Sequence, residues 1–377
     1  MKNIFEDYQI KIGESSLFAI NRSVNVHQDG TTPFCRDKDG TLWAISGHSH
    51  SGEVAMFNGT CLDDLKYAYP INLNFCVGHA DYAFNRVCYP EGIKARGSVW
   101  PFGLYICPNT GRFFAFFHNE TGWFCRGTEY DSFGHCETPR YDSDFRHIGM
   151  MHSDDKGKTW TFDRWVLSAE EVCFTELHNP DAVNVIGQKA DIVSLGSGDF
   201  TLFVDYDAGY LYIIYNIVRV DIKNGFWAGC DAYIARSRIR GDGIVPDFIK
   251  YYNGSFCEPG NFGKETPIAL NSWHAKAVYS KLHDCYILTS TRVTPGRKPP
   301  LNPVDGVMQI RTGKCLTEWS EPITVCKDGK EWGNHYLALV SDSKDSSPSV
   351  LTEDSFSLLS NHNGTDVLRY KVNLRSK

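Results

Sequence analysis

The sequence predicts an all-β protein, and more specifically a five-bladed β-propeller. Helical periodicity is nearly absent, and the apolar runs are short, β-rich and bounded by Gly, Asp and Asn. Aromatic residues make up 14% of the chain and glycine is frequent, which suits many short strands joined by tight turns. One strand pattern also recurs five times along the 377 residues, and such repeats are typical of propellers. We therefore expect a single domain, residues 1–377.

The repeated pattern is a turn, then an aromatic strand, then polar residues. Its copies are residues 39–50, 110–120, 208–218, 282–292 and 353–364. The aligned positions Trp43, Phe114, Tyr212, Tyr286 and Leu358 are 71, 98, 74 and 72 residues apart. A strand candidate precedes each copy, at residues 31–37, 99–108, 199–206, 274–281 and 335–342, and another follows it, at residues 53–59, 147–155, 230–238, 306–313 and 366–372.

A weaker fourth strand follows in some units, for example at residues 160–167 and 321–326. Five units of four antiparallel strands, each unit about 70 residues long, predict five propeller blades. Because the last unit ends after its third strand, we expect the N-terminal segment "SLFAINRS", residues 16–23, to supply the missing outer strand and close the ring. A pair of β-sandwich domains is the alternative.

Composition argues against several classes of partner. The formal net charge is −7 and the sequence has no basic cluster, so a nucleic-acid partner is not expected. No apolar run approaches the roughly 20 residues needed to span a bilayer, and the first residues lack the apolar core of a signal peptide, which predicts a cytoplasmic protein without membrane contact. The 13 Cys occur singly, which favours buried reduced thiols over zinc or disulfides.

The strand order predicts where a site would lie. Because neighbouring strands are antiparallel, the starts of the first and third strands of a blade and the end of its second strand share one face of the disc. Candidate residues at the starts of first strands are Asp29, Trp100, Asp199, Trp273, His274 and His335, and those at the ends of second strands are His48, His50, His118, Glu120 and Arg292. A face with so many His, carboxylate, Arg and Trp side chains predicts a binding funnel near the axis.

Long loops between blades reach the same face. They contribute four further candidates, Glu91, Asp181, Glu258 and Glu265. Loops of this length in a compact domain are usually functional.

The stretch "HSDDKGKTWTF", residues 152–162, has the composition of a calcium loop or a catalytic carboxylate pair. It resembles the Asp box of sialidases and related propellers through Ser153, Asp155, Gly157, Thr159 and Trp160. However, it joins the third and fourth strands of the second blade, and that turn lies on the face opposite the funnel. We therefore expect a structural turn rather than a catalytic or calcium site.

In architecture the whole chain resembles the five-bladed propeller glycoside hydrolases, the class of arabinanases, xylosidases and invertase relatives. That class places an Asp at the start of the innermost strand of the first blade, where "QDGTTPF" has Asp29. Further carboxylates from later blades enter the same funnel, and "FFHNET" offers Glu120 while "GSGDFTLFVDY" offers Asp199. The general-acid Glu of the class aligns to no single position, because Glu120, Glu258 and Glu265 all compete.

Glycoside hydrolysis requires two carboxyl groups, one that protonates the leaving oxygen and one that activates water or attacks directly. We predict Asp29 as base or nucleophile, Glu120 as proton donor, and Asp199 as a third carboxylate that orients the sugar or tunes a neighbour's pKa. Trp100 and Trp273 are candidates for stacking on sugar rings, and the funnel His residues with Arg292 are candidates for hydrogen bonds to substrate. No cofactor is required, although a structural or axial calcium is a further hypothesis.

Three alternatives remain open at this point, all with a carbohydrate partner. A sialidase would need six blades, three Arg around the substrate carboxylate and a Tyr nucleophile. A glycoside phosphorylase would need a basic phosphate pocket. A non-catalytic glycan-binding propeller would need stacking aromatics and amides rather than converging carboxylates.

Overall fold

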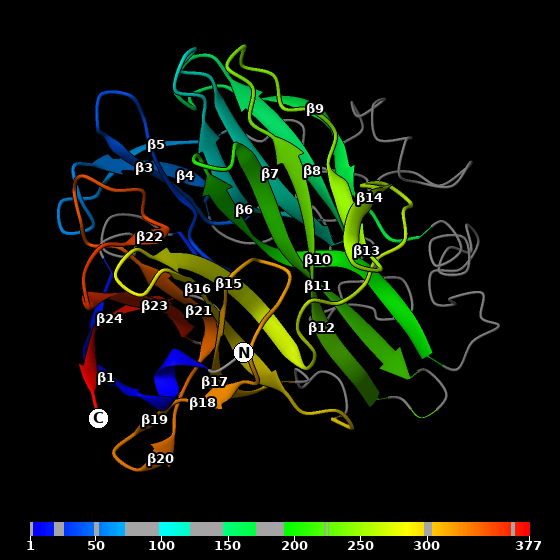
Figure 1. Ribbon diagram of the computed structural model, residues 1–377. Helices are drawn as coiled ribbons and strands as arrows, with labels where there is room; N and C mark the ends of the chain where they lie inside the picture. Colours follow the sequence, from blue (N-terminus) through cyan, green and yellow to red (C-terminus); the bar gives the residue numbers. More distant parts are fainter. Residues whose placement is uncertain are drawn as a thin grey trace.

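The computed structural model is almost entirely β-structure (Figure 1). It describes residues 3–18, 26–48, 53–71, 98–120, 146–170, 192–221, 224, 226–297, 304–362 and 366–377. Within these ranges the helical content is a single 3₁₀ turn, η1 (Ile4–Glu6), and none of the described helical structure is long or apolar enough to cross a membrane. The all-β prediction is confirmed.

Most strands fall into five consecutive groups of antiparallel neighbours, and a parallel bridge between Arg146 and Gly196 joins groups 2 and 3 in one nine-stranded sheet. Group 1 contains β2 (Phe34–Arg36), β3 (Leu42–Ser46), β4 (Ala55–Gly59) and β5 (Lys66–Pro70). Group 2 contains β6 (Ser98–Ile106), β7 (Phe113–Glu120), β8 (Arg146–Ser153) and β9 (Thr161–Leu167). Group 3 contains β10 (Ile192–Asp205), β11 (Tyr210–Asp221), β12 (Phe226–Arg238), β13 (Ile249–Tyr252) and β14 (Ser255–Pro259), one strand more than the four predicted.

The last two groups complete the set. Group 4 contains β15 (Ser272–Ser280), β16 (Cys285–Val293), β17 (Val304–Gly313) and β18 (Ile323–Thr324), with β22 (Val350–Leu351) parallel to β15. Group 5 contains β21 (His335–Val340), β23 (Ser355–His362), β24 (Asp366–Ser376) and the N-terminal β1 (Tyr8–Leu17). A separate small hairpin joins β19 (Cys326–Lys327) to β20 (Lys330–Glu331).

The N-terminal strand pairs with the last strand of the chain. In Figure 1 the blue β1 lies beside the red β24, and the pairing is antiparallel from Tyr8 opposite Ser376 to Leu17 opposite Leu368. An N-terminal outer strand was predicted, but its position was wrong: the strand begins at Tyr8 rather than at residue 16. Alternation is weak in β1, because most of its side chains are exposed, so the apolar "SLFAI" was the more visible sequence signal.

Apolar side chains form a hydrophobic cluster between each pair of successive groups. The cluster that joins groups 1 and 2 includes Met56 and Phe113, and the cluster that joins groups 2 and 3 includes Phe116 and Tyr215. Three further clusters join group 3 to group 4, group 4 to group 5, and group 5 back to group 1. Since each fully buried large side chain contributes about 1.5–3 kcal/mol, these interfaces hold the groups face to face.

The turn at residues 153–160 is held by its own side chains. Asp155 accepts hydrogen bonds from the backbone N–H of Thr159 at 2.9 Å and from the hydroxyls of Ser153 and Thr159, both at 2.7 Å. The indole N–H of Trp160 donates to the carbonyl of Gly157 at 2.9 Å. These bonds engage both carboxylate oxygens within the turn, as expected for a structural role.

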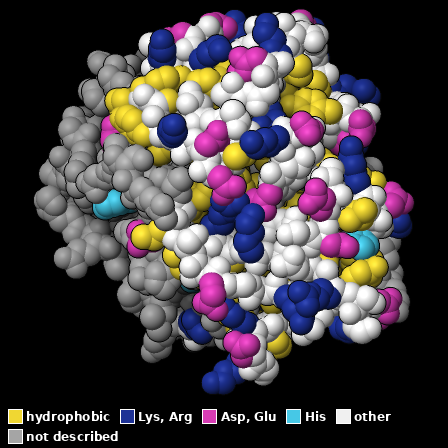
Figure 2. Space-filling model, turned by 90° about the vertical axis from the view of Figure 1, so that its left-hand side faces the viewer, with side chains coloured by type: hydrophobic (Ala, Val, Ile, Leu, Met, Phe, Trp, Pro, Cys, Tyr) yellow, Lys and Arg dark blue, Asp and Glu magenta, His cyan; other side chains and the backbone are white. Residues whose placement is uncertain are grey.

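Surface charge and cysteine state complete the description. On the face seen in Figure 2, Lys and Arg side chains are interspersed with Asp and Glu. The cysteines in the described ranges are all free thiols. Cys35, Cys61, Cys107, Cys230 and Cys285 are buried, as predicted, whereas Cys257, Cys315 and Cys326 are exposed.

Candidate functional site

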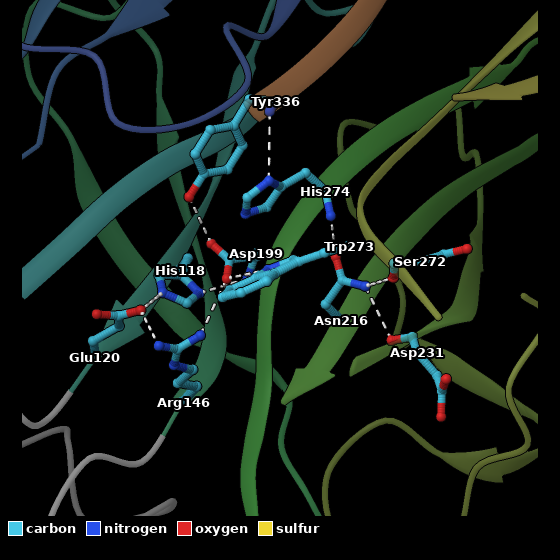
Figure 3. A network of polar contacts seen from close by, with 10 residues as sticks. All are labelled: His118, Glu120, Arg146, Asp199, Asn216, Asp231, Ser272, Trp273, His274 and Tyr336. Atoms are coloured by element: carbon cyan, nitrogen blue, oxygen red, sulfur yellow. Dashed lines mark hydrogen bonds and ion pairs between the residues drawn. The ribbon is translucent and has the colours of Figure 1, made fainter. Parts of the chain in front are cut away.

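A one-residue β-bulge interrupts the first strand of groups 3, 4 and 5, and β10 has a second irregularity between Ser194 and Ser197. The recurring bulge falls at Asp199 in β10, at His274 in β15 and at Tyr336 in β21. All three residues have positive φ, at 39°, 54° and 52°. This conformation costs a non-glycine residue of the order of 1–3 kcal/mol and is concentrated at functional sites. The three side chains are brought together as a result (Figure 3).

Asp199 is the centre of this cluster. One carboxylate oxygen accepts from the Tyr336 hydroxyl at 3.0 Å. The other accepts from the indole N–H of Trp273 at 2.9 Å and from the guanidinium of Arg146 at 3.1 Å. The carboxylate is 6% exposed and each of its oxygens has a donor, so Asp199 is fixed in place rather than available to attack a substrate.

Arg146, at the start of β8, joins Asp199 to Glu120. Its other terminal nitrogen lies 2.9 Å from Oε1 of Glu120. The same oxygen lies 3.0 Å from Nε2 of His118. Because Nδ1 of His118 accepts a hydrogen bond from the backbone N–H of Asp199 at 2.9 Å, the ring proton belongs on Nε2, where it is donated to Glu120.

This network keeps two carboxylates ionised. Burial acts to raise the pKa of both Glu120 and Asp199. For Glu120 the Arg146 guanidinium and the hydrogen bond from His118 outweigh burial, and its pKa lies below the usual value. The pKa of Asp199 is lowered in the same way, because the charges around it, which include Arg146, and the hydrogen bond from Trp273 outweigh burial.

Asp29 has the opposite electrostatics. Burial, and then the negative charges of Asp199 and Glu120, raise its pKa from 3.8 to about 7. Within the described part of the chain, the Asp29 carboxyl makes no hydrogen bond or ion pair. Asp29 is therefore a carboxyl that exchanges a proton near neutral pH and has oxygens available to water or substrate.

A second layer of contacts fixes His274 and Tyr336. The Asn216 side chain accepts from the backbone N–H of His274 at 2.8 Å and donates to the carbonyls of Ser272 and Asp231 (Figure 3). The rings of His274 and Tyr336 stack with their centroids 3.7 Å apart. Burial holds the pKa of His274 well below its usual value, so its imidazole is neutral.

Glycine makes room for His118. A Cβ at Gly198 would lie 2.5 Å from Cε1 of the His118 ring, closer than real Cβ contacts come. The glycine before Asp199 thus allows the ring to reach the Asp199 backbone. This contact explains why a glycine stands directly before Asp199 in the stretch "GSGD", residues 196–199.

The predicted aromatic platforms have a different role from the one expected. Trp100 and Trp273 are each only 4% exposed. Trp100 stacks on His48, with centroids 5.3 Å apart, and meets His118 edge to face, while Trp273 supports Asp199. These contacts engage the indole rings as supports for other site residues and leave little ring face open for a sugar. His335 lies beside His274, with ring centroids 5.6 Å apart.

Several other candidates lie away from Asp199. The carboxylate of Glu265 contacts Lys250 at 2.7 Å and the Tyr215 hydroxyl, in a separate buried network. Glu258 lies on β14 and accepts from a backbone N–H in its own loop, at Lys264. Arg292 forms a two-pronged ion pair with Glu331, with both contacts at 2.9 Å. The candidates His50, Glu91 and Asp181 lie outside the described residues.

Sequence reasoning missed Arg146 and Tyr336. Arg146 begins a third strand, and the starts of third strands share the site's face, but the predicted site drew only on first and second strands. Tyr336 follows His335 directly, and the bulge in β21 shifts the inward position by one residue. The first could have been found by applying the strand rule in full. The second had no signal in the sequence.

A cation site is conceivable here, because ligand atoms of His118, Glu120 and Asp199 lie within 4.8 Å of one another. However, the guanidinium of Arg146 already contacts both carboxylates. A divalent ion would have to share this space with a fixed positive charge. The residues present therefore fit an ion pair network better than a calcium site.

Comparison with solved structures finds glycoside hydrolases. A family 117 glycoside hydrolase of Zobellia galactanivorans has a TM-score of 0.51 at 9% identity, over 99% of this chain and 92% of that one. The catalytic domain of a GH62 α-L-arabinofuranosidase of Coprinopsis cinerea has a TM-score of 0.45 at 10% identity, over 97% of both chains. An exo-β-1,3-galactanase of Clostridium thermocellum has a TM-score of 0.47 at 13% identity, over 94% of this chain and 61% of that one.

Neither the protein-family models nor the curated protein sequences gave a match. The likeness to the family 117 glycoside hydrolase nevertheless confirms the predicted resemblance to propeller glycoside hydrolases. At this level of identity the likeness concerns the fold alone.

Proposed function

We propose that the five strand groups are the blades of a closed propeller and that the chain is a glycosidase acting at the site around Asp199. Three features of the described residues support the closed ring. Successive groups are joined by apolar clusters, one of which joins group 5 to group 1. The first and last strands of the chain pair with each other. Finally, strand residues of groups 1 to 4 line one cavity together with residues 345–349, which follow β21 of group 5.

The observation that carries the proposed chemistry is the contrast between Asp29 and its neighbours. Asp29 has a pKa of about 7 and oxygens without a protein partner, whereas Glu120 and Asp199 are ionised and tied to Arg146. A carboxylate whose pKa lies near the working pH is an effective general base. We assign Asp29 to removing a proton from the attacking water, whose oxygen bonds to the anomeric carbon while the bond to the leaving oxygen breaks and that oxygen takes a proton from solvent.

The surroundings of Glu120 argue against its predicted role as proton donor. Its carboxylate is ionised in this arrangement, so it carries no proton to deliver to a leaving oxygen. Glu120 and Asp199 instead supply negative charge beside Asp29, which raises the pKa of that base. The same charge would stabilise an oxocarbenium-like transition state, in which the sugar becomes positively charged.

The arginines favour a neutral sugar over an anionic one. Arg146 contacts two carboxylates, Arg219 lies 2.6 Å from Asp231, and Arg292 is paired with Glu331. Binding a sialic acid carboxylate or a phosphate would require breaking these pairs. The arginines in the described part of the site therefore give no support to the sialidase and phosphorylase alternatives. The converging carboxylates also favour a hydrolase over a protein that only binds glycans.

The test is a hydrolysis screen over arabinosides, xylosides, galactosides, fructosides and sialosides. We expect Asp29→Asn to lower kcat on the responsive substrate by about 10²–10⁴-fold, the usual contribution of general base catalysis. Ligand binding and thermal unfolding should stay close to wild type, since this carboxyl makes no hydrogen bond within the described structure. A matched control is Asp247→Asn, which changes a carboxylate whose side chain is 91% exposed.

Two results would count against the proposal. Full activity of Asp29→Asn on the correct substrate would remove Asp29 from the chemistry. Glycan binding without turnover of any glycoside, in the wild type, would favour the non-catalytic alternative.

A further inference from the structure

A second feature, independent of the proposed hydrolysis, is the inner cavity, whose volume is about 280 Å³. Its wall includes Phe34 of group 1, Phe102 of group 2, Thr201 of group 3, Lys276 of group 4, and Ser347 from the segment between β21 and β22. Phe102 also packs against the rings of His118 and Tyr336 in the candidate site. Group 4 contributes a cationic side chain to the wall, Lys276, which lies in the middle of β15.

Lys276 is a buried cation without a protein counter-charge. The residue is 7% exposed, and its ammonium group makes no hydrogen bond or ion pair with the described residues. Burial alone lowers its pKa to about 8, so the amine is still mostly protonated at neutral pH. Its Nζ atom is not fully buried and Lys276 lines the cavity, so water or an ion in the cavity can solvate the charge.

The same chain shows what a fully paired buried lysine looks like. Lys250 is 0% exposed, and its ammonium group donates to the carbonyls of Ser168 at 2.6 Å and Gly263 at 3.0 Å. Glu265 neutralises it at 2.7 Å. All three bonding directions of Lys250 are therefore used by the protein, whereas those of Lys276 are directed to no described group.

The other charged residues in the cavity wall are engaged elsewhere or lie at its far end. Arg36 donates to the carbonyls of four residues, namely Gly40, Thr60, Ser343 and Ser346. Asp37 accepts from the indole of Trp43 and from backbone N–H groups of its own turn. Lys38 and Asp345 complete the charged set, and neither they nor Asp37 affects the pKa of Lys276. The charge of Lys276 is left for something that enters the cavity.

We propose that the inner cavity is a binding site for a small monovalent anion, held by the ammonium group of Lys276. A single positive charge matches a single negative one. Much of the wall is apolar, with Phe34, Phe102 and Leu104 among its residues, and this favours weakly hydrated anions such as halides or small carboxylates over sulfate. A volume of about 280 Å³ accommodates such an ion with a few waters.

Bromide is a suitable probe because its anomalous X-ray scattering identifies its position. Crystals of the wild-type protein soaked in sodium bromide should show an anomalous peak in contact with Nζ of Lys276. The same soak of Lys276→Met, an apolar variant of similar length, should show none. The absence of the peak in wild type, or its persistence in the Met variant as an adventitious ion only, would overturn the proposal.

A solution experiment tests the same site without crystals. Replacing sodium gluconate by sodium bromide at constant ionic strength should raise the Tm of wild type by roughly 2–4 °C relative to Lys276→Met, as linkage requires for a ligand that binds the folded state. Lys314→Met is the matched control, since Lys314 is exposed and paired with Asp284, and it should behave as wild type. Equal bromide responses in wild type and Lys276→Met would contradict an anion at this lysine. If Lys276→Met does not fold, the wild-type soak alone decides.

Discussion

Replacing Glu120 by Gln should move the pH dependence of catalysis to lower pH. His118 and Arg146 both contact the same oxygen of Glu120, Oε1, so the amide oxygen of a Gln can keep these two contacts. The substitution removes one of the negative charges that raise the pKa of Asp29. Two unit charges roughly 10 Å apart interact by about 1.7 kcal/mol at an effective dielectric constant of ~20, which is slightly more than one pK unit.

We therefore expect the pKa of Asp29 to fall by about one unit in Glu120→Gln. Because a base must be unprotonated to act, kcat/KM of the wild type should rise with pH through about 7, and the rising limb of the variant should lie about one pH unit lower. The limb in kcat/KM reports the free enzyme, which is the state described by the structure.

The assay is kcat/KM from pH 4 to pH 9, on one glycoside with a good leaving group and one with a poor leaving group. Glu331→Gln is the control, because Glu331 is half exposed, pairs with Arg292 and is not among the charges that shift the pKa of Asp29. An unmoved limb would refute the electrostatic coupling. A large loss confined to the substrate with the poor leaving group would return the role of proton donor to Glu120.

Three further predictions concern the support of the site. Gly198→Ala should displace His118, because the new Cβ would lie 2.5 Å from the ring. It should lower kcat/KM and the Tm, with a stability loss of about 1–3 kcal/mol. Wild-type kinetics would contradict the packing argument. Asp155→Ala removes hydrogen bonds of the turn and should lower the free energy of unfolding by about 1–3 kcal/mol, and with it the Tm. At temperatures well below the Tm, kcat/KM should stay unchanged, whereas a catalytic role of Asp155 would reduce it. Exhaustive chelation should change neither kcat/KM nor the Tm, since Arg146 already neutralises the two carboxylates, and a loss reversed by calcium would show a metal.

Much of the strand arrangement follows from the sequence because it depends on local patterns. The repeated aromatic strands predicted β3, β7, β11, β16 and β23 closely, since an apolar run between turn residues has few other solutions. The turn at Ser153 was also predictable, because its hydrogen bonds join residues at most four positions apart. The same turn lies at the end of β8 opposite Arg146, and seven residue steps at about 3.3 Å place it roughly 23 Å from the site.

The site was predictable only in part because its geometry depends on contacts between distant segments. The position of Asp199 follows from the strand order, but the bond from Arg146 that keeps it ionised joins two different groups. Likewise, the pattern of Trp100 and Trp273 suggests sugar platforms, and only the packing shows that these rings support His118 and Asp199 instead. The protonation of Asp29 depends on charges contributed by two other groups.

The repeated bulge explains how a scaffold built for uniform strands produces an irregular site. In groups 2 to 5 one extra residue interrupts the first strand, at Phe102, Asp199, His274 and Tyr336. These four side chains meet: Phe102 lies over His118 and beside Tyr336, Tyr336 stacks on His274 and its hydroxyl binds Asp199. Since the β-bulge recurs in each of these groups, the type of residue at the bulge determines which side chain that group adds to the site. Exchanging that one residue between groups should therefore change the charge of the site without changing the fold around it.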